Sequence, residues 1–101
     1  MAVYQLSPAA RNDLADLWLY LSENVSDQRA DSFIDEFGEK CQQLTLHPFL
    51  GRARDELRPG LRSLPLHPYL IFYDVPHSSL LVIRRVLHQR QDIDSILGES
   101  Q

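Results

Sequence analysis

The sequence predicts an α+β domain in which a helical hairpin packs on a small antiparallel sheet, in the order β-α-α-β-β-β followed by a short helix. Between residues 8 and 46, apolar side chains recur every three or four positions, which indicates two amphipathic helices. Residues 69–73 and 80–83 are short apolar runs separated by turn-forming residues, which is typical of antiparallel strands. At 101 residues the chain has the length of one domain, which we assign to residues 1–101.

The first strand is predicted at residues 3–6, which alternate in polarity. Ser7 then offers a hydroxyl at the N-cap of a helix, and Pro8 occupies the first helical position, where no N–H is needed. The apolar stripe of this helix consists of Ala10, Leu14, Leu17, Trp18, Leu21 and Val25. Its polar face, with Arg11, Asp13, Asp16 and Glu23, is expected to contact water.

A second helix is predicted from Ser26, another N-cap residue, to His47, which precedes a proline. Its apolar stripe consists of Ala30, Phe33, Ile34, Phe37, Cys41 and Leu44. Gly38 is expected to mark close helix packing, since a glycine inside a helix otherwise costs about 1 kcal/mol relative to alanine. The short connection between the two helices predicts an antiparallel hairpin.

The second half of the chain is predicted to supply most of the sheet. Residues 49–60 have no regular period and are assigned to a surface connection. Strands are expected at residues 61–65, 69–75 and 80–88, with turn-forming residues at 74–79 and one closing helical turn at 92–97. The helices are expected on one face of the sheet.

The charge of the chain is divided unevenly between its halves. Residues 1–50 carry three basic and eight acidic side chains, whereas residues 51–101 carry seven arginines and six acids. This distribution, with a net charge of −4, argues against a protein that coats nucleic acid. Without a signal-peptide pattern, an apolar run of membrane length or more than the single Cys41, we expect a cytoplasmic protein that contacts no membrane and needs no metal or cofactor.

His88 is the histidine with the strongest case for chemistry. It ends the last predicted strand, between Arg84-Arg85 and Arg90, where an imidazole among guanidiniums could act as an acid on a phosphodiester. The alternative, a strand-end histidine hydrogen-bonded to a neighbouring loop, stays open. The other histidines, His47, His67 and His77, lie beside prolines and are assigned to turns or loops.

Two adjacent arginines interrupt the last strand. Because side chains alternate along a strand, Arg84 and Arg85 are expected on opposite faces, with Arg85 on the face of Leu81, Ile83 and Leu87. Arg85 would then need a carboxylate or carbonyl partner. Arg62 could join Arg84 in a cationic patch, which would bind carboxylates as readily as phosphate.

Several short segments together resemble a known family. They are residues 4–10, 13–14, 18–20, 48–52, 56–63, 69–73 and 85–88, which span nearly the whole chain in the right order. In these segments the chain resembles the ParE-type toxins of the RelE/ParE superfamily, the toxic halves of type II toxin–antitoxin pairs. The resemblance implies a helical hairpin on a small antiparallel sheet, as derived above.

The resemblance also implies two competing activities. ParE-like members are associated with DNA gyrase inhibition, whereas RelE-like members cut mRNA on the ribosome. The nuclease branch typically has an arginine after the first aromatic residue of the strand that matches residues 69–73, and this chain has Leu70 there. We therefore expect a gyrase inhibitor that is not an enzyme. The alternative is a nuclease with His88 as acid or base and with Arg62 and Arg84 on the phosphate; a third hypothesis is an inactive member that only binds antitoxin.

The partners expected from the resemblance are a cognate antitoxin, in a hetero-oligomer, and DNA gyrase, without sequence-specific nucleic-acid binding. An antitoxin segment is expected to cover the sheet and the hairpin. The residues assigned to antitoxin binding are Arg62, Leu64, Tyr69, Phe72 and Arg84. For gyrase, the last strand and the tail are the expected region, with Arg90 and residues 92–97 as candidates.

Overall fold

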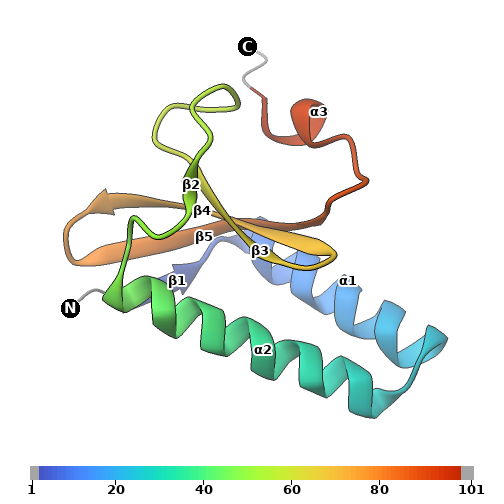
Figure 1. Ribbon diagram of the computed structural model, residues 1–101. Helices are drawn as coiled ribbons and strands as arrows, with labels where there is room; N and C mark the ends of the chain where they lie inside the picture. Colours follow the sequence, from blue (N-terminus) through green and yellow to red (C-terminus); the bar gives the residue numbers. More distant parts are fainter. Residues whose placement is uncertain (1–2, 99–101) are drawn as a thin grey trace.

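The computed structural model describes residues 3–98, in which a helical hairpin packs against one face of a five-stranded sheet (Figure 1). The strands lie in the order β1-β5-β4-β3-β2. In chain order the elements are β1 (Val3–Leu6), α1 (Pro8–Asn24), α2 (Asp27–Leu46), β2 (Arg52–Ala53), β3 (Arg62–Leu66), β4 (Tyr69–His77), β5 (Leu80–His88) and α3 (Ile93–Leu97). The predicted α+β class and the order of its main elements are confirmed. Within the described residues, no helix is both long and apolar enough to cross a membrane.

The sheet is mixed, which corrects the prediction of an antiparallel sheet. Strand β1 runs parallel to β5, with Val3 opposite Leu80 and Leu6 opposite Ile83. The other strand pairs are antiparallel. The pairing continues past the end of β1, because the Ser7 N–H donates to the Ile83 carbonyl at 2.9 Å. The start of α1 is therefore attached to the middle of β5.

Local sequence signals set the ends of the long helices, as predicted. The Ser7 hydroxyl accepts a hydrogen bond from Ala10 N at 3.0 Å, and the Ser26 hydroxyl accepts one from Arg29 N at the same distance. Helix α2 ends at Leu46, with His47 as its C-cap. Val25, assigned to the apolar stripe, is instead the exposed C-cap of α1, so that part of the prediction is wrong.

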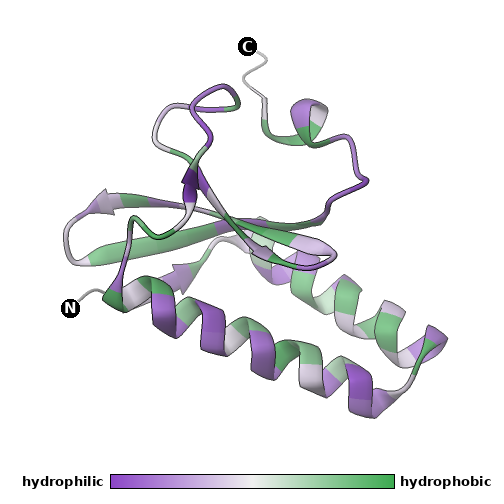
Figure 2. Cartoon of the chain, in the orientation of Figure 1, coloured by the Kyte–Doolittle hydropathy of each residue, from purple (hydrophilic) through white to green (hydrophobic). Residues whose placement is uncertain are grey.

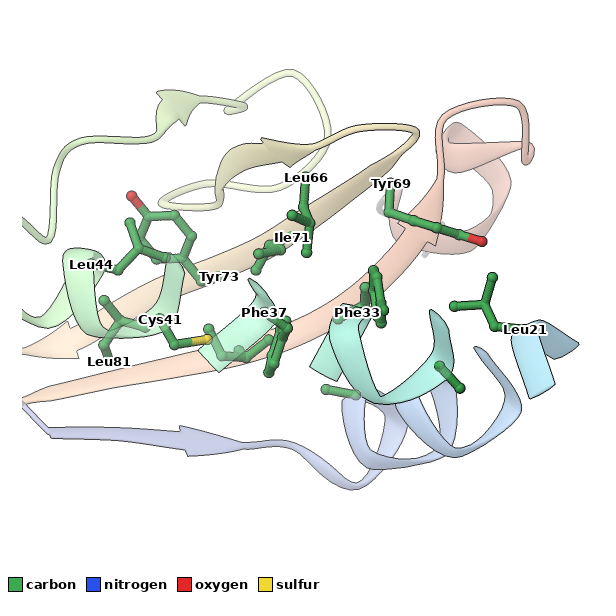
Figure 3. Packing of buried hydrophobic residues seen from close by; sticks show 14 residues of the cluster. Leu21, Phe33, Phe37, Cys41, Leu44, Leu66, Tyr69, Ile71, Tyr73 and Leu81 are labelled. Atoms are coloured by element: carbon green, nitrogen blue, oxygen red, sulfur yellow. The ribbon is translucent and has the colours of Figure 1, made fainter. Parts of the chain in front are cut away.

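The main core lies between the hairpin and the sheet. Figure 3 shows Phe33, Phe37, Cys41 and Leu44 of α2 against side chains of β3 and β4, and all four are buried. Polar and apolar residues alternate around both helices, whereas β4 and β5 are mostly apolar (Figure 2). Ile34 lies at the edge of this core and is exposed rather than buried.

Gly38 does not mark close helix packing. A methyl group at its position would have no heavy atom of another group within 4 Å. The glycine instead borders a shallow surface groove between α2 and Tyr4. The prediction of a helix–helix contact at this residue is therefore wrong.

The second face of the sheet, away from the hairpin, is also partly covered. Helix α3 and residues 54–61 lie on that side in Figure 1. They enclose a smaller apolar cluster of Leu57, Leu61, Phe72, Leu87 and Leu97. The expectation that all helices share one face is thus wrong for α3. Residues 49–60 are also more ordered than predicted, because they contain β2 and the buried Leu57.

Candidate functional site

The candidate site is built around the two arginines of β5, which lie at an irregularity of the strand. In the pairing of β4 with β5, Phe72 lies opposite Arg85 but Tyr73 lies opposite Ile83, so one extra residue is inserted in β5. Ile83 and Val86 both belong to the hairpin-side core. The two arginines between them therefore both leave that core, and both line a hollow with Leu97 on the second face. The prediction of opposite faces is wrong because strict alternation stops at this bulge.

Arg85 forms the ion pair that its position required. Its Nε and Nη2 donate to the two carboxylate oxygens of Asp13 at 2.8 and 2.9 Å, and Val86 N donates to the same carboxylate at 2.9 Å. The Asp13 side chain is only 12% exposed and that of Arg85 28%. Hydrogen bonding to Asp13 raises the pKa of the Arg85 guanidinium, against an opposing effect of burial.

Asp13 is the functional residue that the sequence analysis missed, because it was assigned to the water-facing side of α1. Strand β1 ends opposite Ile83, so the outer edge of β5 beyond that point has no neighbouring strand. Asp13 covers this edge from α1 and satisfies the N–H of Val86. One feature could have indicated it. Asp13 lies on the helix that directly follows β1, and β1 pairs with β5, the strand that carries the two arginines.

Arg84 has a partner within its own hairpin. Its Nε lies 3.1 Å from both carboxylate oxygens of Asp74 on β4. Both side chains remain partly exposed, at 35% and 23%. This ion pair leaves both Nη groups of Arg84 available to a further anion.

Arg62 does not join Arg84 in a cationic patch. It lies opposite Tyr73, whose side chain faces the hairpin, and directly opposed residues share a face. Its Nη1 donates to the carbonyls of Gly51 and Phe49 at 2.7 and 3.3 Å, and its guanidinium lies 4.8 Å from the centre of the Phe49 ring. Arg62 thus holds residues 49–51 against the sheet, on the face opposite to Arg84.

Tyr73 strengthens the same junction. Its hydroxyl donates to the Pro48 carbonyl and accepts from Gly51 N, both at 2.8 Å. Burial raises the pKa of this phenol, although the hydrogen bond from Gly51 lowers it. A methyl group on Gly51 would lie 2.6 Å from the hydroxyl oxygen, so glycine is required for the close approach.

His88 lies apart from the arginines that were proposed to act with it. It is opposite Tyr69 on the hairpin side of the sheet, with ring centres 5.3 Å apart. Its Nδ1 accepts a hydrogen bond from Arg90 N at 3.0 Å, as the alternative of a strand-end histidine bonded to a loop predicted. Arg62 lies on the far side of β4 and is paired four residues further along it, so the two residues are offset by about 13 Å in the strand direction alone, at 3.3 Å per residue. Arg84 is on the opposite face.

The hollow beside His88 is acidic and aromatic rather than cationic. Its volume is about 320 Å³. The lining residues are Asp13, Asp16, Leu17, Tyr20, Tyr69, Val86, His88 and Gln91. Such a lining does not suit a phosphodiester, because it includes the Asp16 carboxylate and no arginine or lysine. The three residues of the nuclease hypothesis are therefore not brought together.

The apolar residues assigned to antitoxin binding lie on different faces and are largely covered. Phe72 is 0% exposed within the second-face cluster, whereas Tyr69 is buried and Leu64 half-buried on the hairpin side. Their role in antitoxin binding stays a prediction. Several other large apolar side chains are exposed, and three of them, Leu46, Phe49 and Leu50, lie close together in the sequence at the end of α2.

The C-terminal segment proposed for gyrase binding is attached to the second face. Arg90 is exposed, and Asp92 forms the N-cap of α3 by accepting from Ser95 N at 3.3 Å. Hydrogen bonds from Ser95 lower the pKa of the Asp92 carboxyl. The 2% exposure of Leu97 shows that the helix is anchored in the second-face cluster. Arg90 therefore projects from a short connection fixed at both ends.

Neither a metal site nor a reactive thiol is evident from the geometry. Over residues 3–98, no group of three or more histidine, cysteine, aspartate or glutamate side chains is arranged to hold a metal ion. Cys41 is fully buried, and burial raises the pKa of its thiol to about 12.

Comparisons with known proteins agree with this architecture. The family model for the ParE toxin of the type II toxin–antitoxin system parDE matches residues 4–93. Toxin ParE1 of Mycobacterium tuberculosis H37Rv is 35% identical over 91 residues, which cover 90% of this chain and 93% of the relative. Toxin ParE1 of Caulobacter vibrioides is 31% identical over 98 residues, covering 97% and 100% of the two chains.

A solved structure described as the chromosomal ParDE TA system from P. aeruginosa has the same fold. It superposes with a TM-score of 0.75 at 20% identity, covering 87% of this chain and 96% of that chain. The resemblance inferred from the sequence is confirmed by the family match over most of the chain and by the identity to curated relatives. The chain belongs to the ParE toxin family of type II toxin–antitoxin systems.

Proposed function

We propose that this protein inhibits DNA gyrase by holding it on cleaved DNA, without catalysing a reaction itself. Membership of the ParE family supports this proposal over the RelE-type alternative. The proposed target places its action in the cytoplasm. A cognate antitoxin would neutralise it by covering part of its surface.

The observation that carries the non-enzymatic part of the proposal is the separation of His88, Arg62 and Arg84. A general acid must lie within hydrogen-bond reach of the group that it protonates, with the charge-stabilising residues close by. Here His88 faces an acidic hollow, Arg62 binds backbone carbonyls, and Arg84 lies on the other face. Rearranging them around one phosphate would require the sheet to be rebuilt.

The test is a supercoiling assay with purified gyrase, relaxed plasmid and this protein, with and without antitoxin. We expect inhibition, accumulation of linear DNA after protein denaturation, and reversal by antitoxin. The variant His88→Ala should inhibit as the wild type does, and His77→Ala, an exposed loop histidine, is its matched control. Unchanged supercoiling together with His88-dependent cleavage of mRNA on ribosomes would reverse the assignment.

For the antitoxin, we propose that it covers the exposed apolar patch formed by Leu46, Phe49 and Leu50. These side chains are 52–68% exposed and follow one another at the end of α2. Arg62 stacks under Phe49 and holds it in place, which would reduce the entropy lost on binding. Aromatic residues in such patches often dominate the binding energy.

Loss of the Phe49 ring should therefore weaken the antitoxin complex. We expect Phe49→Ser to raise the dissociation constant about tenfold or more, since hot-spot residues contribute over 1 kcal/mol. Val25→Ser, an equally exposed apolar residue at the tip of the hairpin, is the control and should change it little. Equal effects of the two substitutions, measured by calorimetric titration, would remove this patch from the proposal.

A further inference from the structure

A second hollow, of about 240 Å³, lies on the face of the sheet away from the hairpin. Four parts of the chain meet there: the start of α1, the bulge of β5, residues 54–61 and α3. The lining residues are Ser7, Ala9, Arg58, Arg84, Arg85, Ile96 and Leu97. Three arginine side chains therefore line one small space, whose other lining residues belong to α3 or to the start of α1.

These guanidiniums retain hydrogen-bond donors that no residue in the range 3–98 uses. Arg84 donates to Asp74 only through Nε, and Arg85 donates to Asp13 through Nε and Nη2. Arg58, which is half-buried, has no ion pair within residues 3–98. The ion pairs thus fix the orientation of two arginines and leave further N–H groups free. Because these side chains are already ordered, they lose less conformational entropy when a ligand binds.

The local charge also favours an anion. Asp74 and Asp13 offset two of the three arginines, which leaves an excess positive charge at Arg58. The N-terminal end of α1, at Ser7 and Ala9, adds a partial positive charge from the helix dipole. Ile96 and Leu97 form an apolar part of the lining, and less water beside them strengthens the attraction for an anion.

We propose that this hollow is a binding site for a single phosphate group. Planar guanidiniums approaching from several directions match the tetrahedral oxygens of a phosphate, each through paired N–H donors. A carboxylate offers only two oxygens in one plane, and Arg84 and Arg85 already bind one carboxylate each. The phosphate is either a diester of the DNA backbone, without base recognition, or free phosphate.

The proposal does not depend on gyrase, so it is tested with the purified chain alone. Inorganic phosphate is titrated at constant ionic strength while the backbone amide signals are followed by NMR. We expect saturable shifts at the amides of Ser7, Ala9, residues 84–86 and residues 96–97. Arg58→Ala should weaken the binding about tenfold, the effect of losing a charge-assisted hydrogen bond. Arg52→Ala, which removes an exposed arginine from β2 outside the hollow, should leave it unchanged.

Two further titrations decide the class and the source of the anion. Three results would overturn the proposal. They are acetate binding as tight as phosphate binding, equal weakening of phosphate binding in the Arg58 and Arg52 variants, and no saturable shifts in the folded wild type. The second titration uses a short DNA duplex without terminal phosphates. If the duplex shifts the same amide signals and Arg58→Ala weakens this effect, the bound phosphate comes from the DNA backbone. Binding of inorganic phosphate but not of the duplex would identify free phosphate. The two assays are independent. Absence of phosphate binding would not affect the supercoiling assay, and phosphate binding can be measured even if the protein does not inhibit gyrase.

Discussion

Replacing Asp13 by asparagine should destabilise the protein strongly, although the change is a single atom on a helix that looks solvent-facing in sequence. The Asp13 carboxylate accepts three hydrogen bonds, two from Arg85 and one from Val86 N. An asparagine offers one oxygen, and its amide group would face the guanidinium of Arg85. Arg85 Nε and Val86 N both donate to Oδ2, so an asparagine oxygen placed there keeps these two bonds at most. The bond from Arg85 Nη2 is lost, and a partly buried cation is left without its counter-ion.

The size of the effect follows from the lost interactions and their exposure. One charge-assisted hydrogen bond from Arg85 is lost, and the other becomes a bond to a neutral oxygen; a charge-assisted bond contributes about 1.5–3 kcal/mol and a neutral one about 0.5–1.5 kcal/mol. Arg85 is 28% exposed, so water replaces part of what is lost. We expect a fall of about 2–3 kcal/mol in the free energy of unfolding. For a domain of this length, that corresponds to a melting temperature lower by roughly 10 °C or more.

The assay is urea denaturation of Asp13→Asn beside Asp16→Asn. Asp16 lies on the same helix and is exposed, and it has no ion pair among the residues that the structure describes, so its substitution should change stability by less than about 0.5 kcal/mol. A double-mutant cycle with Arg85→Gln should give a coupling energy of about 1 kcal/mol or more. Equal midpoints for the two asparagine variants would refute the role assigned to Asp13.

Two other predictions concern buried groups. Tyr73→Phe removes the hydroxyl that joins Gly51 and Pro48, leaving a buried N–H unsatisfied, so we expect a loss of about 1–3 kcal/mol in urea denaturation, and unchanged stability would contradict this. The pKa of Cys41 is raised from 9.0 to about 12, so its contribution to stability is full below pH 9 and is lost as the pH rises toward 12. Above pH 9, the free energy of unfolding of the wild type should therefore fall with pH more steeply than that of Cys41→Ala, by up to about 1.4 kcal/mol per pH unit. Parallel curves for the two proteins would contradict this, because they would show that the thiol ionises in the folded state.

The features that could be predicted from the sequence are those that depend on residues close together in the chain. Ser7-Pro8 and Ser26-Asp27 set the helix starts because a hydroxyl and a first-turn proline or acid act within one turn. The end of α2 before Pro48 follows from the restricted backbone ahead of a proline. The strands of the second half could be located because each is a short apolar run between turn residues.

Apart from the helix end at Val25, the main errors involve contacts between distant parts of the chain. Neither the parallel pairing of β1 with β5 nor the bulge at Arg84 leaves a periodic signal, since both depend on where another strand begins and ends. The bulge in turn decided which face the arginines occupy. Asp13 was misplaced for the same reason, because its partners lie 72 and 73 residues away in the chain. Arg58 lines the second-face hollow only because residues 54–61 fold onto that face of the sheet.

The position of β1 beside β5 has a consequence for how the toxin is made. Its first strand finds its partner only when residues 80–83 exist, and Asp13 only when Arg85 and Val86 do. The helical hairpin depends on local contacts and can form early, whereas the pairing of Val3 with Leu80 must close a loop of about three quarters of the chain, which is slow. A ribosome that stops before Leu80 thus releases a chain without the strand that joins both ends of the molecule. Fragments that stop before residue 80 should therefore lack this fold, because the complete sheet can form only after β5 has been translated.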